Sequence, residues 1–150
     1  MPDRLRLADL VARGSLLVND GYRTRADELG RPGIPVLRVA EVQQGQLTPT
    51  FGDHVLEKYR SKIADKVSRP RDVVVTTKGT VGRVALMSVD DSEFVYSPQV
   101  CFFRCLDDAI HPRWLYYWFT DRSSPVRQPA CKHRRTWLPT SISPTCGRCT

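Results

Sequence analysis

The feature that most constrains the fold is a stretch in which two β-prone runs flank a short break that contains glycine. Residues 73–77 are mainly β-branched, and residues 84–89 form a second apolar run. Gly79 and Gly82 lie in the break and permit a tight connection between the two runs. The pattern therefore predicts a β-hairpin over residues 73–89.

Two cations, Lys78 and Arg83, flank the glycines of this connection. In the structural interpretation, the glycines only provide the positive φ angles that the turn needs. In the functional interpretation, they also let a bulky partner approach the two cations. A Walker-type phosphate loop is excluded, because Gly82 leads into Arg-Val-Ala-Leu and not into Lys and Ser or Thr at a helix start. The Gly-x-x-Gly clamp of a KH domain is disfavoured, because it lies between helices, whereas β-prone runs surround this one.

At 150 residues, the chain is long enough for one domain with a hydrophobic core, and its 41% hydrophobic and 26% charged residues are typical of a globular protein. No apolar stretch approaches the roughly 20 residues of a membrane-spanning helix. The first residues are not followed by the apolar core of a signal peptide. We therefore expect a soluble, cytoplasmic protein without a membrane partner.

The net charge of +7 is unevenly distributed along the chain. Residues 1–126 contain 18 Lys and Arg and all 16 Asp and Glu, so their net charge is +2. Residues 127–150 contain five Lys and Arg and no acidic residue. The charge of the whole chain is therefore no argument by itself for binding nucleic acid. The change in composition predicts a domain of residues 1–126 and a separate basic tail of residues 127–150.

The tail also contains a candidate metal-binding set, made of Cys131, His133, Cys146 and Cys149. Thiolates and imidazoles are the usual ligands of structural zinc, and the last two cysteines have the Cys-x-x-Cys spacing of a zinc knuckle. A zinc-stabilised nucleic-acid-binding protein is therefore one alternative. The poor spacing of the first pair and the lack of acidic residues favour a disordered tail without metal.

Hydrophobic periodicity predicts a mixed α+β fold, with a twisted, partly antiparallel sheet flanked by helices. Helices are expected where apolar residues recur at helical spacing, near residues 5–12, 55–66 and 112–121. Strands are expected in two further apolar runs, at residues 34–42 and 94–104. A bend at Ser97 and Pro98 should interrupt the second run. The polar, turn-rich segment 19–33 should be an exposed loop.

Some side chains in these elements have both a structural and a functional interpretation. Arg38, in an otherwise apolar run, either pairs with a carboxylate such as Glu41 or points into a groove. Cys101 and Cys105 are expected to be buried as small hydrophobic residues. The last helix carries a broad apolar stripe, formed by Trp114, Leu115, Trp118 and Phe119. Core packing is favoured for this stripe over stacking on unpaired bases, because few cations accompany it.

Four blocks occur in order along the chain. They are Gly-Ile-Pro-Val-Leu-Arg-Val-Ala-Glu-Val at 33–42, Arg-Asp-Val-Val-Val-Thr-Thr-Lys-Gly-Thr-Val-Gly-Arg-Val-Ala-Leu at 71–86, Ser-Pro-Gln-Val-Cys-Phe at 97–102 and Ile-His-Pro-Arg-Trp-Leu-Tyr-Tyr at 110–117. Together they resemble the target recognition domain of type I restriction-modification specificity subunits. The resemblance covers residues 5–126.

This resemblance implies an α/β domain that reads one half of a split DNA site. Complete specificity subunits of this family carry two such domains joined by helical spacers, and they assemble with methyltransferase subunits and with a restriction subunit. This chain departs from them, since it has one such domain and no recognisable spacer helix. For the tail, suitable codons read in another frame permit a segment similar to the one that follows the aromatic helix in these subunits. We therefore expect residues 127–150 to be the frameshifted, disordered tail of a truncated subunit.

The residues themselves predict no catalytic site and no cofactor. The chain lacks the Pro-Pro that the Asp/Asn-Pro-Pro-Tyr/Phe motif of adenine methyltransferases requires. No lysine has an acidic residue two positions earlier, as in the metal-dependent sites of many nucleases. His54, His111 and His133 lack a convincing nucleophile or carboxylate partner. We therefore expect a non-catalytic DNA reader.

Double-stranded DNA is expected to bind where cations accompany turns and loops. The predicted DNA-facing residues are Tyr22, Arg23, Arg25, Arg38, Lys78, Thr80 and Arg83, with Gln99 and Asn19 as weaker candidates. Lys and Arg contact phosphates, whereas in the major groove Arg pairs with guanine and Gln or Asn with adenine. For segment 19–33, a loop that only faces solvent is the alternative, because Asp20, Asp27 and Glu28 accompany its cations.

Overall fold

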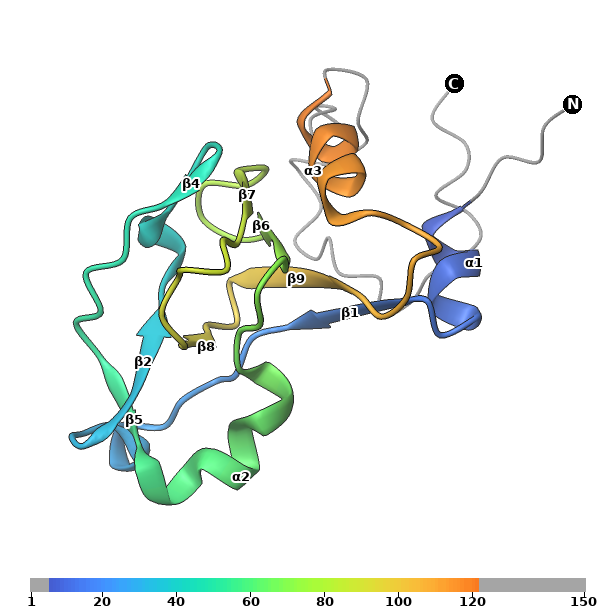
Figure 1. Cartoon of the computed structure of the whole chain (residues 1–150). Coiled ribbons are helices and arrows are strands. Elements are labelled where there is room, and N and C mark those ends of the chain that lie inside the picture. Colours follow the sequence, from blue (N-terminus) through green and yellow to red (C-terminus); the bar gives the residue numbers. More distant parts are fainter. Residues whose placement is uncertain (1–5, 122–150) are drawn as a thin grey trace, which may run out of the picture.

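The predicted hairpin forms one half of the main β-sheet in the computed structural model, which describes residues 6–121 (Figure 1). β6 (Val73–Thr76) pairs antiparallel with β7 (Val84–Leu86). On its other edge, β6 pairs with β9 (Val100–Cys105), and β9 pairs with β1 (Leu16–Asp20). The strand order is therefore β1-β9-β6-β7, antiparallel throughout. The hairpin prediction is confirmed, although the second strand is shorter than the predicted run.

A second, smaller sheet has the order β5-β2-β8. β2 (Gly33–Leu37) pairs antiparallel with β5 (His54–Leu56) and parallel with β8 (Val95–Tyr96). Between β2 and β5, the chain forms a two-stranded ribbon of β3 (Val42–Gln43) and β4 (Gln46–Leu47). The predicted mixed α+β class with a partly antiparallel sheet is therefore confirmed.

Two helices form where the periodicity predicts them, α1 (Leu7–Ala12) and α3 (Pro112–Thr120). Pro112 suits the first turn of α3, where its missing N–H would have no partner inside the helix. Nδ1 of His111 caps this helix, because it accepts a hydrogen bond from the Arg113 N–H at 3.2 Å. None of the helices in the described residues is long and apolar enough to cross a membrane.

The helix predicted at 55–66 begins later than expected and is divided into short turns. After β5, the chain forms η3 (Glu57–Tyr59), α2 (Arg60–Ile63) and η4 (Ala64–Lys66). Val55, at the predicted start, is fully buried and lies opposite Ile34 in the second sheet. Strand pairing therefore overrides the helical spacing of the first two residues.

The strand predicted at 34–42 is also too long, since β2 is followed by the short helical turn η2 (Val39–Glu41). The buried carboxylate of Glu41 accepts hydrogen bonds from the N–H groups of Arg38, Thr50 and Phe51, at 2.7, 2.6 and 2.7 Å. Burial raises the pKa of Glu41, but these hydrogen bonds outweigh it and leave the pKa below its ordinary value. The carboxylate ends the strand because it holds the backbone in a turn.

The sheets and helices form four layers, with hydrophobic clusters between them. One face of the main sheet, which includes Val73 and Val75, packs against α1 and α3. Alternate residues such as Val74 and Phe102 belong to the other face, which packs against β2 and β8. The second sheet packs in turn against α2 through Ile63. Figure 1 shows α3 above the main sheet and α2 below the second sheet.

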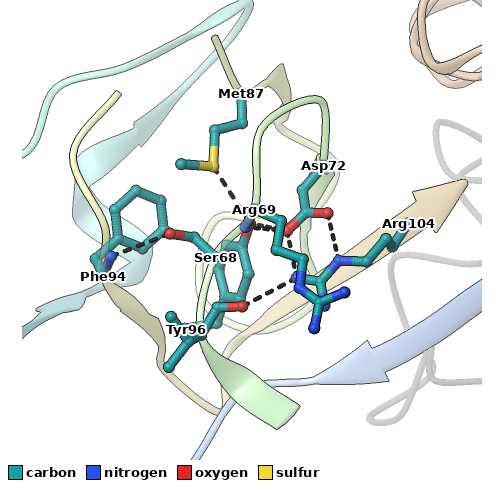
Figure 2. Close-up of polar contacts among 8 residues, drawn as sticks. Ser68, Arg69, Asp72, Met87, Phe94, Tyr96 and Arg104 are labelled. Carbon is teal, nitrogen blue, oxygen red and sulfur yellow. Dashed lines mark hydrogen bonds and ion pairs between the residues drawn. The ribbon is translucent and has the colours of Figure 1, made fainter. Parts of the chain in front are cut away.

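A buried ion pair joins three strands near the start of β6 (Figure 2). Asp72 is fully buried, and Nε and Nη2 of Arg104 donate to its two carboxylate oxygens at 2.8 and 2.7 Å. The Tyr96 hydroxyl and the Arg69 N–H donate to Oδ2 of the same carboxylate at 2.8 and 2.9 Å. Burial, together with the charge of Asp72, raises the pKa of Tyr96. The carboxylate thus connects the turn before β6 to β8 and β9.

Candidate nucleic-acid interface

One end of the main sheet gathers several connections that are far apart in the sequence. The loop 77–83 leaves β6 there, and β9 begins there, because Thr76 lies opposite Val100. The Thr77 N–H donates to the Gln99 carbonyl at 3.0 Å, which ties the loop to the bend before β9. We call this region, made of loop 77–83, bend 97–99 and the adjacent segment 38–47, the hairpin end.

Gly21 allows the chain to leave β1 along this bend. Its N–H donates to the Val100 carbonyl at 3.1 Å, and the next N–H, of Tyr22, donates to the Tyr96 carbonyl at 2.7 Å. A Cβ on Gly21 would lie 1.9 Å from the carbonyl oxygen of Ser97, so no other residue fits without moving the backbone. This crossing holds segment 20–22 against the bend.

The loop of the hairpin has a fixed conformation. Gly79 and Gly82 have φ angles of +74° and +89°, so both provide the positive φ that the turn needs, which the structural and the functional interpretation of these glycines share. The Gly82 N–H donates to the Thr76 carbonyl at 3.0 Å, and the buried Thr76 hydroxyl accepts the Arg83 N–H at 2.9 Å. Lys78 is half-buried in this loop and Thr80 is exposed, and neither side chain has a hydrogen-bond partner among residues 6–121.

The ribbon β3–β4 lies beside the hairpin and is bonded to it. The Gly45 N–H donates to the Val84 carbonyl at 2.8 Å, and the Gln44 side-chain oxygen accepts the Val84 N–H at 3.4 Å. Nη1 of Arg83 donates to the Val42 carbonyl at 3.2 Å. One guanidinium nitrogen of Arg83 is therefore engaged in holding the ribbon. Two-residue strands are too short to show an alternating pattern, so the sequence did not predict this ribbon.

Arg38 lies next to this region, in the turn after β2. Its guanidinium pairs with Asp53, so the expected pairing with a carboxylate is found, but the partner is not Glu41. The side chains of Arg38 and Asp53 are 57% and 34% exposed, so solvent weakens the pair and Arg38 remains accessible. Val39 lies close to the hairpin loop, because its two methyl groups are 3.8 and 3.9 Å from the position that a Cβ on Gly79 would occupy.

The loop with Tyr22, Arg23 and Arg25 leads away from the hairpin end. Figure 1 shows this blue segment at the lower end of β2 and β5, with the hairpin loop at the top. The Tyr22 hydroxyl donates to both carboxylate oxygens of Glu28, at 2.9 and 3.1 Å, and Lys62 pairs with the same carboxylate. The Arg25 N–H, followed by Lys62, lowers the pKa of Glu28 to about 2. Tyr22 is thus occupied in ordering the loop, and Arg23 and Arg25 remain exposed.

The two weaker candidates also differ in their surroundings. Gln99 is exposed in the bend beside the hairpin loop. The side-chain oxygen of Asn19 accepts a hydrogen bond from Lys66 at 2.5 Å, and Lys66 also pairs with Asp20. Gln99 therefore belongs to the hairpin end, whereas the Asn19 amide has a structural partner.

Fewer residues of the apolar stripe of α3 are buried in the core than predicted. Leu115 and Phe119 are fully buried against the main sheet, but Trp114 is 54% exposed. Trp114 stacks on the half-buried Trp118, with ring centroids 6.5 Å apart. Residues four positions apart share one helix face, and only one such face meets the sheet. The burial expected of Cys101 is confirmed, whereas Cys105 is half-buried.

The exposed charges of the hairpin end have one sign. Loop 77–83, bend 97–99 and segment 38–47 contain Arg38, Lys78 and Arg83, and their only acidic residue is the buried Glu41. Asp53, which pairs with Arg38 and is 34% exposed, lies outside these segments. By contrast, the loop with Arg23 and Arg25 also contains the exposed Asp27. A surface with cations, amides and no exposed carboxylate of its own suits a polyanion. The structure thus brings Arg38, Lys78, Thr80, Arg83 and Gln99 together in the hairpin end, whereas the Tyr22 hydroxyl and the exposed Arg23 and Arg25 belong to the loop that leads away from it.

The predicted zinc ligands and the whole predicted tail lie outside the described residues. The alternative with Cys131, His133, Cys146 and Cys149 therefore stays a prediction, as does the boundary between residues 1–126 and 127–150. Among residues 6–121, no group of three or more His, Cys, Asp or Glu side chains is arranged to hold a metal ion.

No protein-family model matches the sequence, and no curated protein matches it significantly. Solved structures do match. One is a chain of the type I R-M system, with a TM-score of 0.54 and 17% identity over 72% of this chain. Another is the HsdS subunit of Thermoanaerobacter tengcongensis, with a TM-score of 0.57 and 15% identity over 79% of this chain. This chain spans only 25% and 29% of those two chains. The similarity confirms, at the level of fold, the predicted resemblance to one domain of a specificity subunit.

Proposed function

We propose that this chain is a sequence-reading module of a type I restriction-modification system, which binds double-stranded DNA and reads one half of a bipartite site. The observation that carries the proposal is the hairpin end, which gathers Arg38, Lys78 and Arg83 without an exposed carboxylate in its own segments, on a domain with the fold of a type I specificity subunit. Lys78 and Arg38 would contact phosphates, which supply most of the affinity in such complexes.

The module has no catalytic role in this proposal. Methylation and cleavage belong to the methyltransferase and restriction subunits of the same system, which would act in the cytoplasm where the DNA is. This chain would select the site for them. The similarity in fold to the HsdS subunit supports this division of labour.

Binding to duplex DNA tests the proposal directly. Fluorescence anisotropy of a labelled duplex, titrated with the full chain at several salt concentrations, should give weak affinity that falls steeply with salt. Lys78→Ala should lower the affinity for all sequences and reduce the salt slope by about 1. Lys58→Ala is the matched control, because Lys58 is an exposed lysine of η3, a segment that runs between β5 and α2 at the lower end of Figure 1, away from the hairpin loop.

Two results would contradict the proposal. One is the absence of salt-dependent duplex binding by a folded chain. The other is an equal effect of the two lysine substitutions, which would leave a general attraction by positive charge as the explanation. A further test replaces the first recognition domain of a complete specificity subunit with residues 1–126 and maps adenine methylation. A new half-site whose methylation becomes less efficient in Lys78→Ala would support the assignment.

A further inference from the structure

The ribbon β3–β4 exposes side-chain amides beside the cations of the hairpin end. Gln43 ends β3, Gln46 begins β4, and Gln44 lies with Gly45 in the turn that joins the two strands. A two-stranded ribbon fits the major groove of B-DNA, and glutamine can form a bidentate pair with N6 and N7 of adenine. The ribbon therefore has both the shape and the chemistry of a base-reading element.

The three glutamines are not equivalent. Nε2 of Gln43 donates to the Ala40 carbonyl at 2.9 Å, and the side-chain oxygen of Gln44 accepts the Val84 N–H at 3.4 Å. Gln46 is exposed, and its amide has no hydrogen-bond partner among the described residues. Bidentate reading of adenine needs a free donor and a free acceptor on the same amide. Among these three glutamines, only Gln46 keeps both available within residues 6–121.

The ribbon is also held firmly enough to position such an amide. Val42 is fully buried, and Leu47, the neighbour of Gln46 on β4, packs against the same hydrophobic cluster. The Gly45 turn has a φ of +85° and is bonded to β7. The Tyr116 hydroxyl of α3 also approaches this turn, at 3.2 Å from the position that a Cβ on Gly45 would occupy. A side chain that reads a base needs such a supporting shell, because small errors in position weaken its hydrogen bonds.

We infer that the β3–β4 ribbon enters the major groove and that Gln46 determines specificity by reading an adenine. This inference rests on the proposed function of the hairpin end. Lys78 in the hairpin loop and Arg38 in the turn after β2 contact the flanking phosphates. Gln46 was not among the predicted site residues, because its exposure and its free amide follow from pairings that the sequence does not show.

A selection experiment with the full chain tests the inference. Duplexes with a randomised central segment are enriched on wild-type chain at low salt and then sequenced. The wild type should enrich a short motif that contains adenine at one position. In Gln46→Ala, the preference at that position should fall by on the order of ten- to a hundredfold, with the rest of the motif retained. In Gln46→Glu, the preference should move toward cytosine, whose N4 amino group donates to a carboxylate.

The outcomes separate this inference from the proposed function. A motif that is unchanged in both Gln46 variants would overturn the inference and leave the DNA-reading function intact. Failure of the wild type to bind or enrich any duplex would overturn the function itself, and the inference with it. Lys78→Ala is the control for a non-reading contact, because it should weaken binding without changing the motif. Circular dichroism of each variant verifies that its fold is intact.

Discussion

Replacing Asp72 by asparagine should destabilise the domain more than any other single change of a polar side chain in the described residues. The Asp72 side chain is fully buried, and that of its partner Arg104 is 8% exposed. The substitution keeps the volume but removes the charge, so that the guanidinium stays buried without a counter-ion. Breaking one side of a buried ion pair typically costs about 3–5 kcal/mol.

The hydrogen bonds around the Asp72 carboxylate explain why the loss of stability in Asp72→Asn should fall in this range. Three of them enter Oδ2, from Arg104, Tyr96 and Arg69, and one enters Oδ1, from Nε of Arg104 (Figure 2). An asparagine oxygen can replace Oδ2, but its amide nitrogen then faces the Arg104 Nε–H, so two donors oppose each other. Arg104 retains one other acceptor among the described residues, the Val67 carbonyl at 2.9 Å. Since a domain of this size is typically stable by about 5–15 kcal/mol, the loss should lower Tm by roughly 10–20 °C.

Urea unfolding of the full chain, followed by circular dichroism, measures this effect. Asp53→Asn is the matched control, because Asp53 forms an ion pair with Arg38 that is largely exposed. It should cost less than about 1 kcal/mol. A double-mutant cycle with Arg104→Met should show that the two losses are not additive, because the second change removes the unpaired charge that the first created. Equal effects of Asp72→Asn and Asp53→Asn would refute the reasoning.

Three further changes test other features of the fold. Because the pKa of Glu28 is lowered from 4.5 to about 2, its carboxylate stabilises the fold above pH 4.5, and this contribution should be lost as the pH falls toward 2. On acidification, the urea midpoint should fall less in Glu28→Gln than in Asp27→Asn, because Glu28→Gln has no carboxylate left to protonate at this position; equal falls would contradict this. Gly21→Ala should destabilise by about 3 kcal/mol or more, because its Cβ would meet the Ser97 carbonyl at 1.9 Å, whereas Gly52→Ala, with nothing within 4 Å, should be nearly neutral in thermal unfolding. Arg71→Gly should raise stability by about 0.5–1 kcal/mol, since the φ of Arg71 is +69°, and a lower Tm would show that its side chain contributes to the fold.

Elements with local signals could be predicted from the residues alone. The hairpin follows from two β-prone runs around Gly79 and Gly82, and both glycines have the positive φ that the turn requires. Helix α3 follows from Pro112 and a regular apolar spacing, and the bend before β9 from Ser97 and Pro98. In each case the information lies within a few neighbouring residues, so no distant partner is needed to specify the conformation.

Tertiary structure alone decided which predicted site residues meet. The partner of Arg38 is Asp53, 15 residues away, and Arg83 bonds the Val42 carbonyl, 41 residues away. Tyr22 was predicted to face DNA, but its hydroxyl bonds Glu28, a carboxylate that also pairs with a lysine 34 residues further on. Gln46 keeps a free amide because the pairing of β4 with β3 and its packing beside β7 leave this side chain exposed. These partners depend on strand register and on the packing of layers, and neither periodicity nor residue type specifies such long-range geometry.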